Sequence, residues 1–322
     1  MGTEGVLVGV FGTDADAKSA LESSLAKKSE AEGITVYHRT DSGRKISLLD
    51  DTSFPGKIQG YSRIASLSDY AFYVFPRSGK LTAPDGELAV LLESLSVKGR
   101  VMILDQSSNQ ETARSSLRGT AVGGYPVEER NLSSTALDLA GLEPRTADAG
   151  GTLVYVDRAF SVKGVGTVAL GFVLRGTVSA HDQLRAVPSP AGASVDVKGI
   201  QINDQDFESS GRGIRVGLSL RGVEADELAR SHWLDDGTTT VSDQLRIAFS
   251  KSQFYKQEVA GRDLHLQLPG EMLTASIGKG GVDGEITAKL PVRVPVWDGM
   301  RVAVIDLNGK GLRVAGGGTC KP

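Results

Sequence analysis

The sequence predicts a multidomain protein in which a doubly wound α/β domain is followed by two small, all-β barrels. Apolar strands alternate with helix-like segments over residues 5–105, a pattern typical of a parallel sheet covered by helices on both faces. After residue 151 the chain changes to short strands separated by Gly, Pro and Asp turns, as expected for small barrels. The 322 residues include 40 glycines, above the average usage of about 7%, which favours a turn-rich chain.

Within the first part, the strand VLVGVF is followed by a loop and by the helix-like AKSALESSLAKKSEAE, where Ala20, Leu21 and Leu25 fall at helical spacing. GITVYHRT and RKISLLDD predict a strand pair. DYAFYVFP and RVMILD predict two more strands, with the helix-like DGELAVLLESLSVKG between them. The Gly-, Ser-, Thr- and Ala-rich residues 119–151 have room for one last strand and a helix before a linker.

Two β-rich blocks make up the remainder of the chain. The first contains TLVYVDRAF, GTVALGFVLRGTV, ASVDVKGIQIN and RGIRVGLSLRGV, and the second begins at GTTTVSDQLRIAFSKS and ends at KGLRVAGGGT. No short repeat of fixed period is present, which disfavours a solenoid or a propeller. We therefore expect an α/β domain at residues 1–148 and barrels at residues 149–237 and 238–322.

Composition excludes several classes of function. The net charge of −3 argues against a non-specific polyanion or DNA binder, which usually carries a strongly basic face. The single cysteine, Cys320, cannot form an internal disulfide, and this suits a reducing cytoplasm. No apolar run approaches the ~20 residues of a membrane span, and the N-terminus lacks a signal-peptide pattern. We expect a soluble cytoplasmic protein, without a metal motif among its four scattered histidines.

The stretch FGTDADAKSAL after the first strand nearly matches the phosphate-binding loop G-x-x-x-x-G-K-[ST]. Gly12, Lys18 and Ser19 are in place, whereas Ala17 stands where the second glycine belongs. In such a loop the lysine reaches the β- and γ-phosphates and the hydroxyl binds Mg²⁺. The Ala17 methyl group and two loop aspartates should weaken anion binding.

The middle of the chain resembles the second domain of translational GTPases of the elongation factor Tu and SelB class. The resemblance rests on VDRAFSVKGVGTVALGFVLRGTVSAHDQL and GIQINDQDFESSGRGIRVGLSLRGVEADELAR, and LRVAGGGT resembles the end of the third domain. The residues at the family spacing are Phe160, Gly164, Gly166, Thr167, Val168, Gly171, Gly176, Asp182, Ile200, Gln201, Asp204, Arg215, Val216, Gly217, Leu220 and Gly222. The sequence is most similar in kind to archaeal SelB-like paralogs with a degenerate G domain, one group of which is linked to pyrrolysine insertion.

The resemblance implies a P-loop NTPase-like first domain that binds GTP and Mg²⁺. Thr35 lies in a G-I-T stretch, and Asp50 lies where the family has D-x-P-G-H. The nucleotide-binding residues implied are Gly12, Ala17, Lys18, Ser19, Thr35 and Asp50, of which Ser19, Thr35 and Asp50 are the implied Mg²⁺ ligands.

Two departures from the family concern hydrolysis and base choice. Phe54 stands where the family carries its catalytic His, and an aromatic ring cannot position the attacking water. DQSS at residues 105–108 replaces the guanine-reading N-K-x-D, which should cost ~1.5–3 kcal/mol of binding. No catalytic residue is predicted, so the sequence leaves GTPase activity open and predicts GTP binding that is weak, altered or absent.

The resemblance also implies that the second and third domains hold the acceptor end of aminoacyl-tRNA. The candidate tRNA-binding residues are Arg158, Lys163, Arg175 and Arg215, for which the alternative is a solvated barrel surface. The leading hypothesis is a monomeric translation elongation factor-like protein of SelB or Tu type that binds aminoacyl-tRNA or the ribosome. Two alternatives stay open: a functional nucleoside triphosphatase with relaxed base choice, and a non-catalytic regulatory or assembly scaffold.

Overall fold

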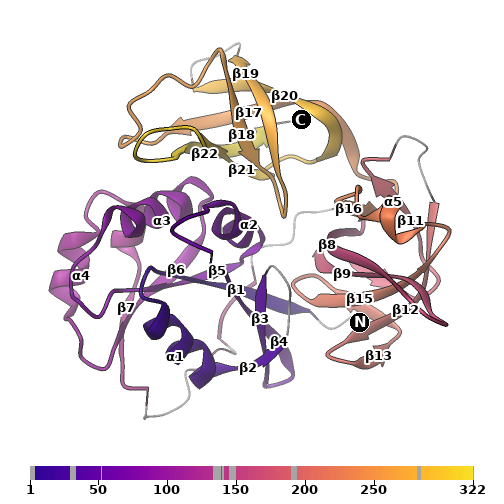
Figure 1. Cartoon of the computed structure of the whole chain (residues 1–322), viewed down its shortest axis with the longest axis horizontal. Helices are drawn as coiled ribbons and strands as arrows, with labels where there is room; N and C mark the ends of the chain where they lie inside the picture. The colour runs from indigo at the N-terminus through magenta and orange to yellow at the C-terminus, as the bar shows by residue number, and fades with distance from the viewer. Residues whose placement is uncertain are drawn as a thin grey trace.

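The computed structural model describes residues 4–29, 34–51, 53–132, 139, 141–144, 150–189, 194–280 and 284–321. They form an α/β domain followed by two bodies built almost entirely of strands, as the sequence predicts (Figure 1). The exact domain boundaries stay predictions, and residues 145–149 lie outside the described ranges. None of the described helices is long and apolar enough to cross a membrane.

The described α/β domain contains one seven-stranded sheet in the order β2-β3-β4-β1-β5-β6-β7. The pairs β4–β1, β1–β5, β5–β6 and β6–β7 are parallel. At the other edge of the sheet, β2, β3 and β4 pair antiparallel. The strands are β1 (Gly5–Phe11), β2 (Lys27–Ser29), β3 (Thr35–Asp41), β4 (Arg44–Asp50), β5 (Tyr70–Val74), β6 (Lys98–Leu104) and β7 (Val127–Arg130).

Helices cover both faces of this sheet, and the alternating side chains of β1 show why. Val6, Val8 and Val10 pack in one hydrophobic cluster with α1, whereas Leu7 and Phe11 pack in another with α2 and α3. Period-two alternation of apolar residues on both faces is what a doubly covered strand requires. The helical segments are α1 (Ala15–Leu25), α2 (Gln59–Leu67), α3 (Ala83–Ser94), α4 (Gln110–Ser116) and the 3₁₀ turn η1 (Ala121–Gly124).

Several elements differ from the sequence expectation, which also did not include the short helices α4 and α5 (Ala225–Leu228). Helix α1 ends at Leu25, and the lysines that follow form the edge strand β2 against β3, so strand pairing overrides the helical propensity of AKKS. Helix α2 was not expected, although Ile58, Tyr61 and Ile64 recur every three residues and are all fully buried.

The second body is a strongly curved sheet in the order β11-β16-β8-β9-β15-β12-β13, and an additional β11–β12 pairing brings its ends together. A short β10–β14 ribbon lies beside it. The elements are β8 (Leu153–Val162), β9 (Gly166–Arg175), β10 (Thr177–Ser179), β11 (Gln183–Val187), β12 (Ser194–Ile202), β13 (Gln205–Phe207), β14 (Ser209–Gly211), β15 (Arg215–Arg221), α5 (Ala225–Leu228) and β16 (Trp233–Asp235).

The third body is a closed barrel in the order β17-β20-β19-β18-β21-β22. It lies over α2 and α3 of the first domain (Figure 1). The strands are β17 (Thr240–Lys251), β18 (Arg262–Gln267), β19 (Met272–Lys279), β20 (Glu285–Val296), β21 (Arg301–Ile305) and β22 (Val314–Lys321).

Candidate functional site

The turn after β1 is shorter than the sequence motif suggests. Only Gly12, Thr13 and Asp14 separate the strand from α1, which begins at Ala15. Asp14 is the N-cap of the helix: its Oδ1 accepts a hydrogen bond from the Ala17 backbone N–H at 3.0 Å, and its Oδ2 accepts one from the Arg77 N–H at 3.1 Å. A carboxylate of the chain therefore occupies the Ala17 backbone donor at this helix N-terminus, where an anion is favoured.

Lys18 is buried and points to other side chains of its own domain. Its Nζ lies 2.5 Å from Asp50 Oδ1 at the end of β4 and also hydrogen-bonds the Tyr61 hydroxyl of α2. Tyr61 donates to Asp50 at 2.9 Å, and its ring packs between Phe11 and Phe54, with centroids 5.3 and 5.1 Å away. Burial and the Asp50 charge raise the pKa of Tyr61 well above its usual value, so its phenol stays protonated and can donate.

Glu22 lies one helical turn beyond Lys18 and is also buried. Burial raises the pKa of Glu22 to about 8; the Asp50 charge adds to this rise, and Lys18 opposes it. At neutral pH Glu22 is therefore largely protonated beside the Lys18–Asp50 ion pair. This single pair of opposite charges is balanced internally.

Of the other candidate nucleotide and metal residues, Thr35 lies beside the Lys18–Asp50 pair and Ser19 points away from it. Ser19 lies on the exposed face of α1, whereas Lys18 is buried. Thr35 is half-buried and pairs with Asp50 across the β3–β4 ladder. Among the described residues no group of three or more His, Cys, Asp or Glu side chains could hold a metal ion.

This arrangement does not fit a GTP–Mg²⁺ complex. A phosphate-binding loop needs several free backbone N–H groups and a lysine that reaches the phosphates. Here the Asp14 carboxylate takes the Ala17 donor, and Lys18 is paired with Asp50. Phe54, in the place of the family His, packs against Tyr61, and its ring has no group that can accept or donate a proton.

The slot of the guanine-reading motif follows β6. Asp105 and Gln106 both adopt left-handed backbone conformations, with φ of 51° and 56°. The Asp105 carboxylate accepts a hydrogen bond from the Leu132 backbone N–H at 3.1 Å and lies 3.7 Å from Arg77. These contacts hold the turn in place and give Asp105 a local structural role.

The four candidate tRNA-binding cations lie in different settings. Arg158 is exposed and lies over the Phe160 ring at 5.5 Å, and Lys163 is exposed in the turn between β8 and β9. Arg175 is buried at the junction of the two barrels, 4.9 Å above the Trp297 ring. Arg215 lines a pocket that faces the first domain, and the nearby Arg158 charge contributes to lowering the pKa of Arg215.

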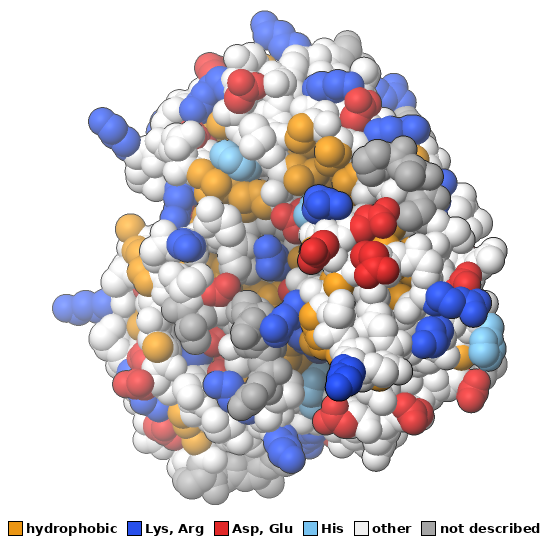
Figure 2. Space-filling model, turned by 45° about the vertical axis from the view of Figure 1, so that its right-hand side comes forward, with side chains coloured by type: hydrophobic (Ala, Val, Ile, Leu, Met, Phe, Trp, Pro, Cys, Tyr) orange, Lys and Arg blue, Asp and Glu red, His pale blue; other side chains and the backbone are white. Residues whose placement is uncertain are grey.

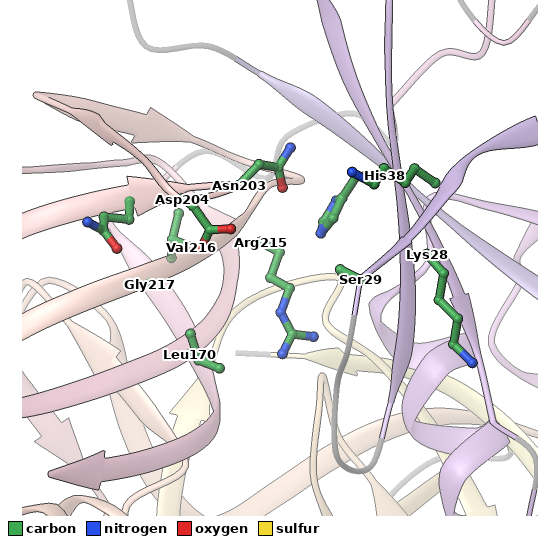
Figure 3. Close-up of a pocket in the computed structure, with 11 residues that line it drawn as sticks. Lys28, Ser29, His38, Leu170, Asn203, Asp204, Arg215, Val216 and Gly217 are labelled. Atoms are coloured by element: carbon green, nitrogen blue, oxygen red, sulfur yellow. The ribbon is translucent and has the colours of Figure 1, made fainter. Parts of the chain in front are cut away.

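Arg215 projects from β15 into a pocket of about 600 Å³ between the second body and the strands β2 and β3 (Figure 3). Its side chain is only 10% exposed, and Nη2 lies 3.5 Å from Asp157. Among the described residues, Nη1 has no hydrogen-bond partner although it is buried. Burial lowers the pKa of Arg215 below its usual value, which marks a cation with incomplete solvation.

The opposite wall of this pocket comes from Lys27, Lys28, Ser29 and His38. Burial, with Arg215 and Lys45 nearby, lowers the pKa of His38 to about 4, so the imidazole is neutral at physiological pH. The sequence analysis did not identify His38, Lys27 or Lys28 as site residues. Strands β2 and β3 come close to β15 only when the first domain packs against the second body, and the sequence alone does not show this packing.

The comparisons with known proteins agree with the domain order. No model of a known protein family matches the chain. An uncharacterised protein of Methanocaldococcus jannaschii is 25% identical over 315 residues, covering 98% of this chain and 99% of that protein. The selenocysteine-specific elongation factor of the same organism is 25% identical over 382 aligned residues, covering 99% of this chain and 80% of that factor.

Solved structures show the same fold. Elongation factor SelB from Methanococcus maripaludis, in complex with the GTP analogue GppNHp, has a TM-score of 0.83 at 20% identity, covering 100% of this chain and 80% of that one. The resemblance to SelB and the EF-Tu-like translational GTPases is confirmed. A bacterial selenocysteine-specific elongation factor has a TM-score of 0.83 at 16% identity, covering 99% of this SelB-like chain and 58% of that one.

Proposed function

We propose that this SelB-like chain is a translation elongation factor-like protein that holds the acceptor end of aminoacyl-tRNA in the pocket between its first domain and second body. GTP binding and hydrolysis are weak or absent in this proposal. The observation that carries it is Arg215, a nearly buried guanidinium that lines a pocket of about 600 Å³ and whose Nη1 has no hydrogen-bond partner in the part of the chain that the structure describes. A buried donor without a partner costs free energy that a ligand oxygen can recover.

The chemistry of the pocket suits a nucleotide end that carries an acyl group. Arg215 and Lys28 supply cationic donors, and neutral His38 and Gln201 offer both donors and acceptors. Leu170 adds apolar surface. Phosphate and ribose oxygens, an adenine edge and an aminoacyl ester can all be paired by such a mixed lining.

A confined site is favoured over a broad basic surface. On the face of the molecule in Figure 2, Lys and Arg side chains are interspersed with Asp and Glu, consistent with the net charge of −3. Binding should therefore depend on the pocket more than on long-range attraction to the phosphate backbone.

Filter binding tests the proposal with aminoacylated and deacylated tRNA at one stated salt concentration. The wild type should bind saturably, with Kd below ~10 μM and a preference for the aminoacylated form. Arg215→Ala should weaken binding roughly 10- to 100-fold, as expected for a lost hydrogen bond to a charged group. Arg215→Lys should recover only part of the loss, because the planar fork is missing.

Arg221→Ala is the matched control, because Arg221 is on the same strand but 74% exposed and paired with Asp196. Its affinity should equal that of the wild type. Equal binding by Arg215→Ala, or no saturable binding at all, would contradict the proposal. The second result would favour the non-catalytic scaffold, with monomeric state and cytoplasmic location still predictions.

A further inference from the structure

The helix N-terminus beside β1 contains its own anion. Asp14 accepts hydrogen bonds from two backbone N–H groups of different segments, Ala17 on α1 and Arg77 after β5. An N-cap normally satisfies donors of its own helix alone. The second bond from Arg77 shows that the carboxylate joins two loops that lie beside each other at the end of the sheet.

Lys18, in the first turns of the same helix, is also paired with a carboxylate of the chain. Lys18 and Asp50 have side chains only 5% and 6% exposed, with Nζ and Oδ1 2.5 Å apart. The Tyr61 hydroxyl supplies a third polar partner. A buried ion pair with further hydrogen bonds is costly to separate, because either partner alone would be a buried charge.

Helix α2 connects this cluster to the third body. It carries Tyr61, and its next residue Ser62 and, one turn after that, Ser66 contact the barrel. Ser62 Oγ donates to Gln267 Oε1 at 2.8 Å, and the Gly270 N–H donates to Ser66 Oγ at 3.0 Å. These contacts are buried, so the position of α2 is fixed from both sides.

We propose that the Asp14 carboxylate and the Lys18–Asp50–Tyr61 cluster substitute for a nucleotide phosphate, so that the three domains keep one arrangement whether or not GTP or GDP is present. Asp14 takes the place of an external anion at the start of α1. Lys18 binds Asp50 instead of a phosphate, and α2 transmits the fixed geometry to the third body. This inference rests on the first domain and its contacts with the third body, and it does not depend on tRNA binding.

The first experiment uses the unchanged full-length protein. Calorimetric titration with GTP, GDP and inorganic pyrophosphate, each with Mg²⁺, should give no saturable heat. The unfolding temperature should stay constant in the presence of each compound, because a ligand that binds only the native state must raise it. Saturable binding of any of the three would overturn the proposal.

The second experiment asks whether an external anion can replace Asp14. Asp14→Ala should lower the unfolding temperature by about 2–4 °C through loss of the cap. Inorganic phosphate, compared with chloride at equal ionic strength, should restore most of this loss. The wild type should gain much less, because its own carboxylate fills the position.

Asn109→Ala is the matched control. Asn109 caps α4 by accepting from the Thr112 N–H at 2.8 Å, and within the described ranges its side chain has no second donor from another segment. The variant should lose stability similarly but gain no more from phosphate than the wild type. Equal phosphate effects in the Asp14 and Asn109 variants would show that Asp14 is an ordinary cap and overturn the proposal.

Discussion

At the scale of single residues, Glu22 gives the first domain a pH dependence that surface carboxylates do not have. Its pKa of about 8 in the folded protein, against an ordinary value of 4.5, reflects burial, with Asp50 raising the pKa and Lys18 and Tyr37 lowering it. Between these pH values the native state holds a proton that the unfolded chain has lost. The free energy of unfolding should therefore fall by up to about 1.4 kcal/mol per pH unit as pH rises through this window.

Glu22→Gln keeps the shape of the protonated carboxyl and cannot ionise. The variant should lose this part of the pH dependence and should be more stable than the wild type above pH ~8. Urea unfolding at several pH values between about 5 and 9 measures the difference. Glu111→Gln at an exposed position of α4 controls for removal of one negative charge. Parallel stability curves for the wild type and Glu22→Gln would contradict the prediction.

The sequence identified some residues of the cluster and missed others for a physical reason. Lys18 and Asp50 were predicted to act together, and the structure places them 2.5 Å apart. A linear motif fixes spacing, but it does not fix where a helix begins. Asp14 is a favoured N-cap residue and starts α1 at once. The position of Asp14 before a helical segment was the sequence signal for this N-cap. The hydrogen bonds of Tyr61 with Lys18 and Asp50 depend instead on tertiary packing.

At the scale of elements, one buried ion pair attaches the start of β1 to the second body. Arg212 Nη2 contacts Asp69 Oδ1, with side chains 9% and 0% exposed, and Asp69 Oδ2 accepts the Leu7 N–H at 3.0 Å. Arg212→Met should destabilise the protein by about 3–5 kcal/mol, because the buried carboxylate of Asp69 would lose the cation that faces it. Denaturant unfolding monitored by far-UV circular dichroism measures this change.

Arg221→Met provides the comparison, because that arginine is paired with Asp196 but is 74% exposed. Its loss should cost no more than about 1 kcal/mol. If the two variants lose similar amounts of unfolding free energy, the Arg212–Asp69 pair does not stabilise the contact between β1 and the second body, and the prediction is wrong. The sequence could not indicate the Arg212 pair, because Asp69 and Arg212 are 143 positions apart and belong to different domains.

The spacing of apolar residues along the chain predicted helices and strands best where that local pattern alone determines the secondary structure. The alternation around Val8 and the apolar run of β5 gave strands at the expected places. Periodicity failed at α2, a short helix with polar residues between Tyr61 and Ile64. The burial of α2 depends on a barrel whose contacting residue Gln267 is 205 positions from Ser62. The residues of the edge strand β2 were predicted to be helical, because their strand conformation depends on hydrogen bonding to the adjacent β3 and not on a local pattern.

At the scale of the whole molecule, one hydrophobic cluster runs from the first domain into both barrels. It joins Ile64 of α2 and Leu88 of α3 to Leu266 and Val302 of the third body, and it reaches Trp233 of the second. Multidomain proteins commonly unfold in separate steps because their interfaces are small and polar. A shared apolar core removes this independence, since one domain cannot unfold without exposing the core of another.

We therefore expect the described domains to unfold in a single cooperative transition. The two tryptophans, Trp233 and Trp297, report on the barrels by fluorescence, and far-UV circular dichroism follows the helices of the first domain. The urea curves from the two signals should coincide, and the calorimetric enthalpy should equal the van't Hoff enthalpy. Leu88→Ala, in α3, should shift both curves together by about 2–5 kcal/mol of stability. A circular dichroism transition that moves alone in this variant would show that the first domain unfolds independently of the barrels.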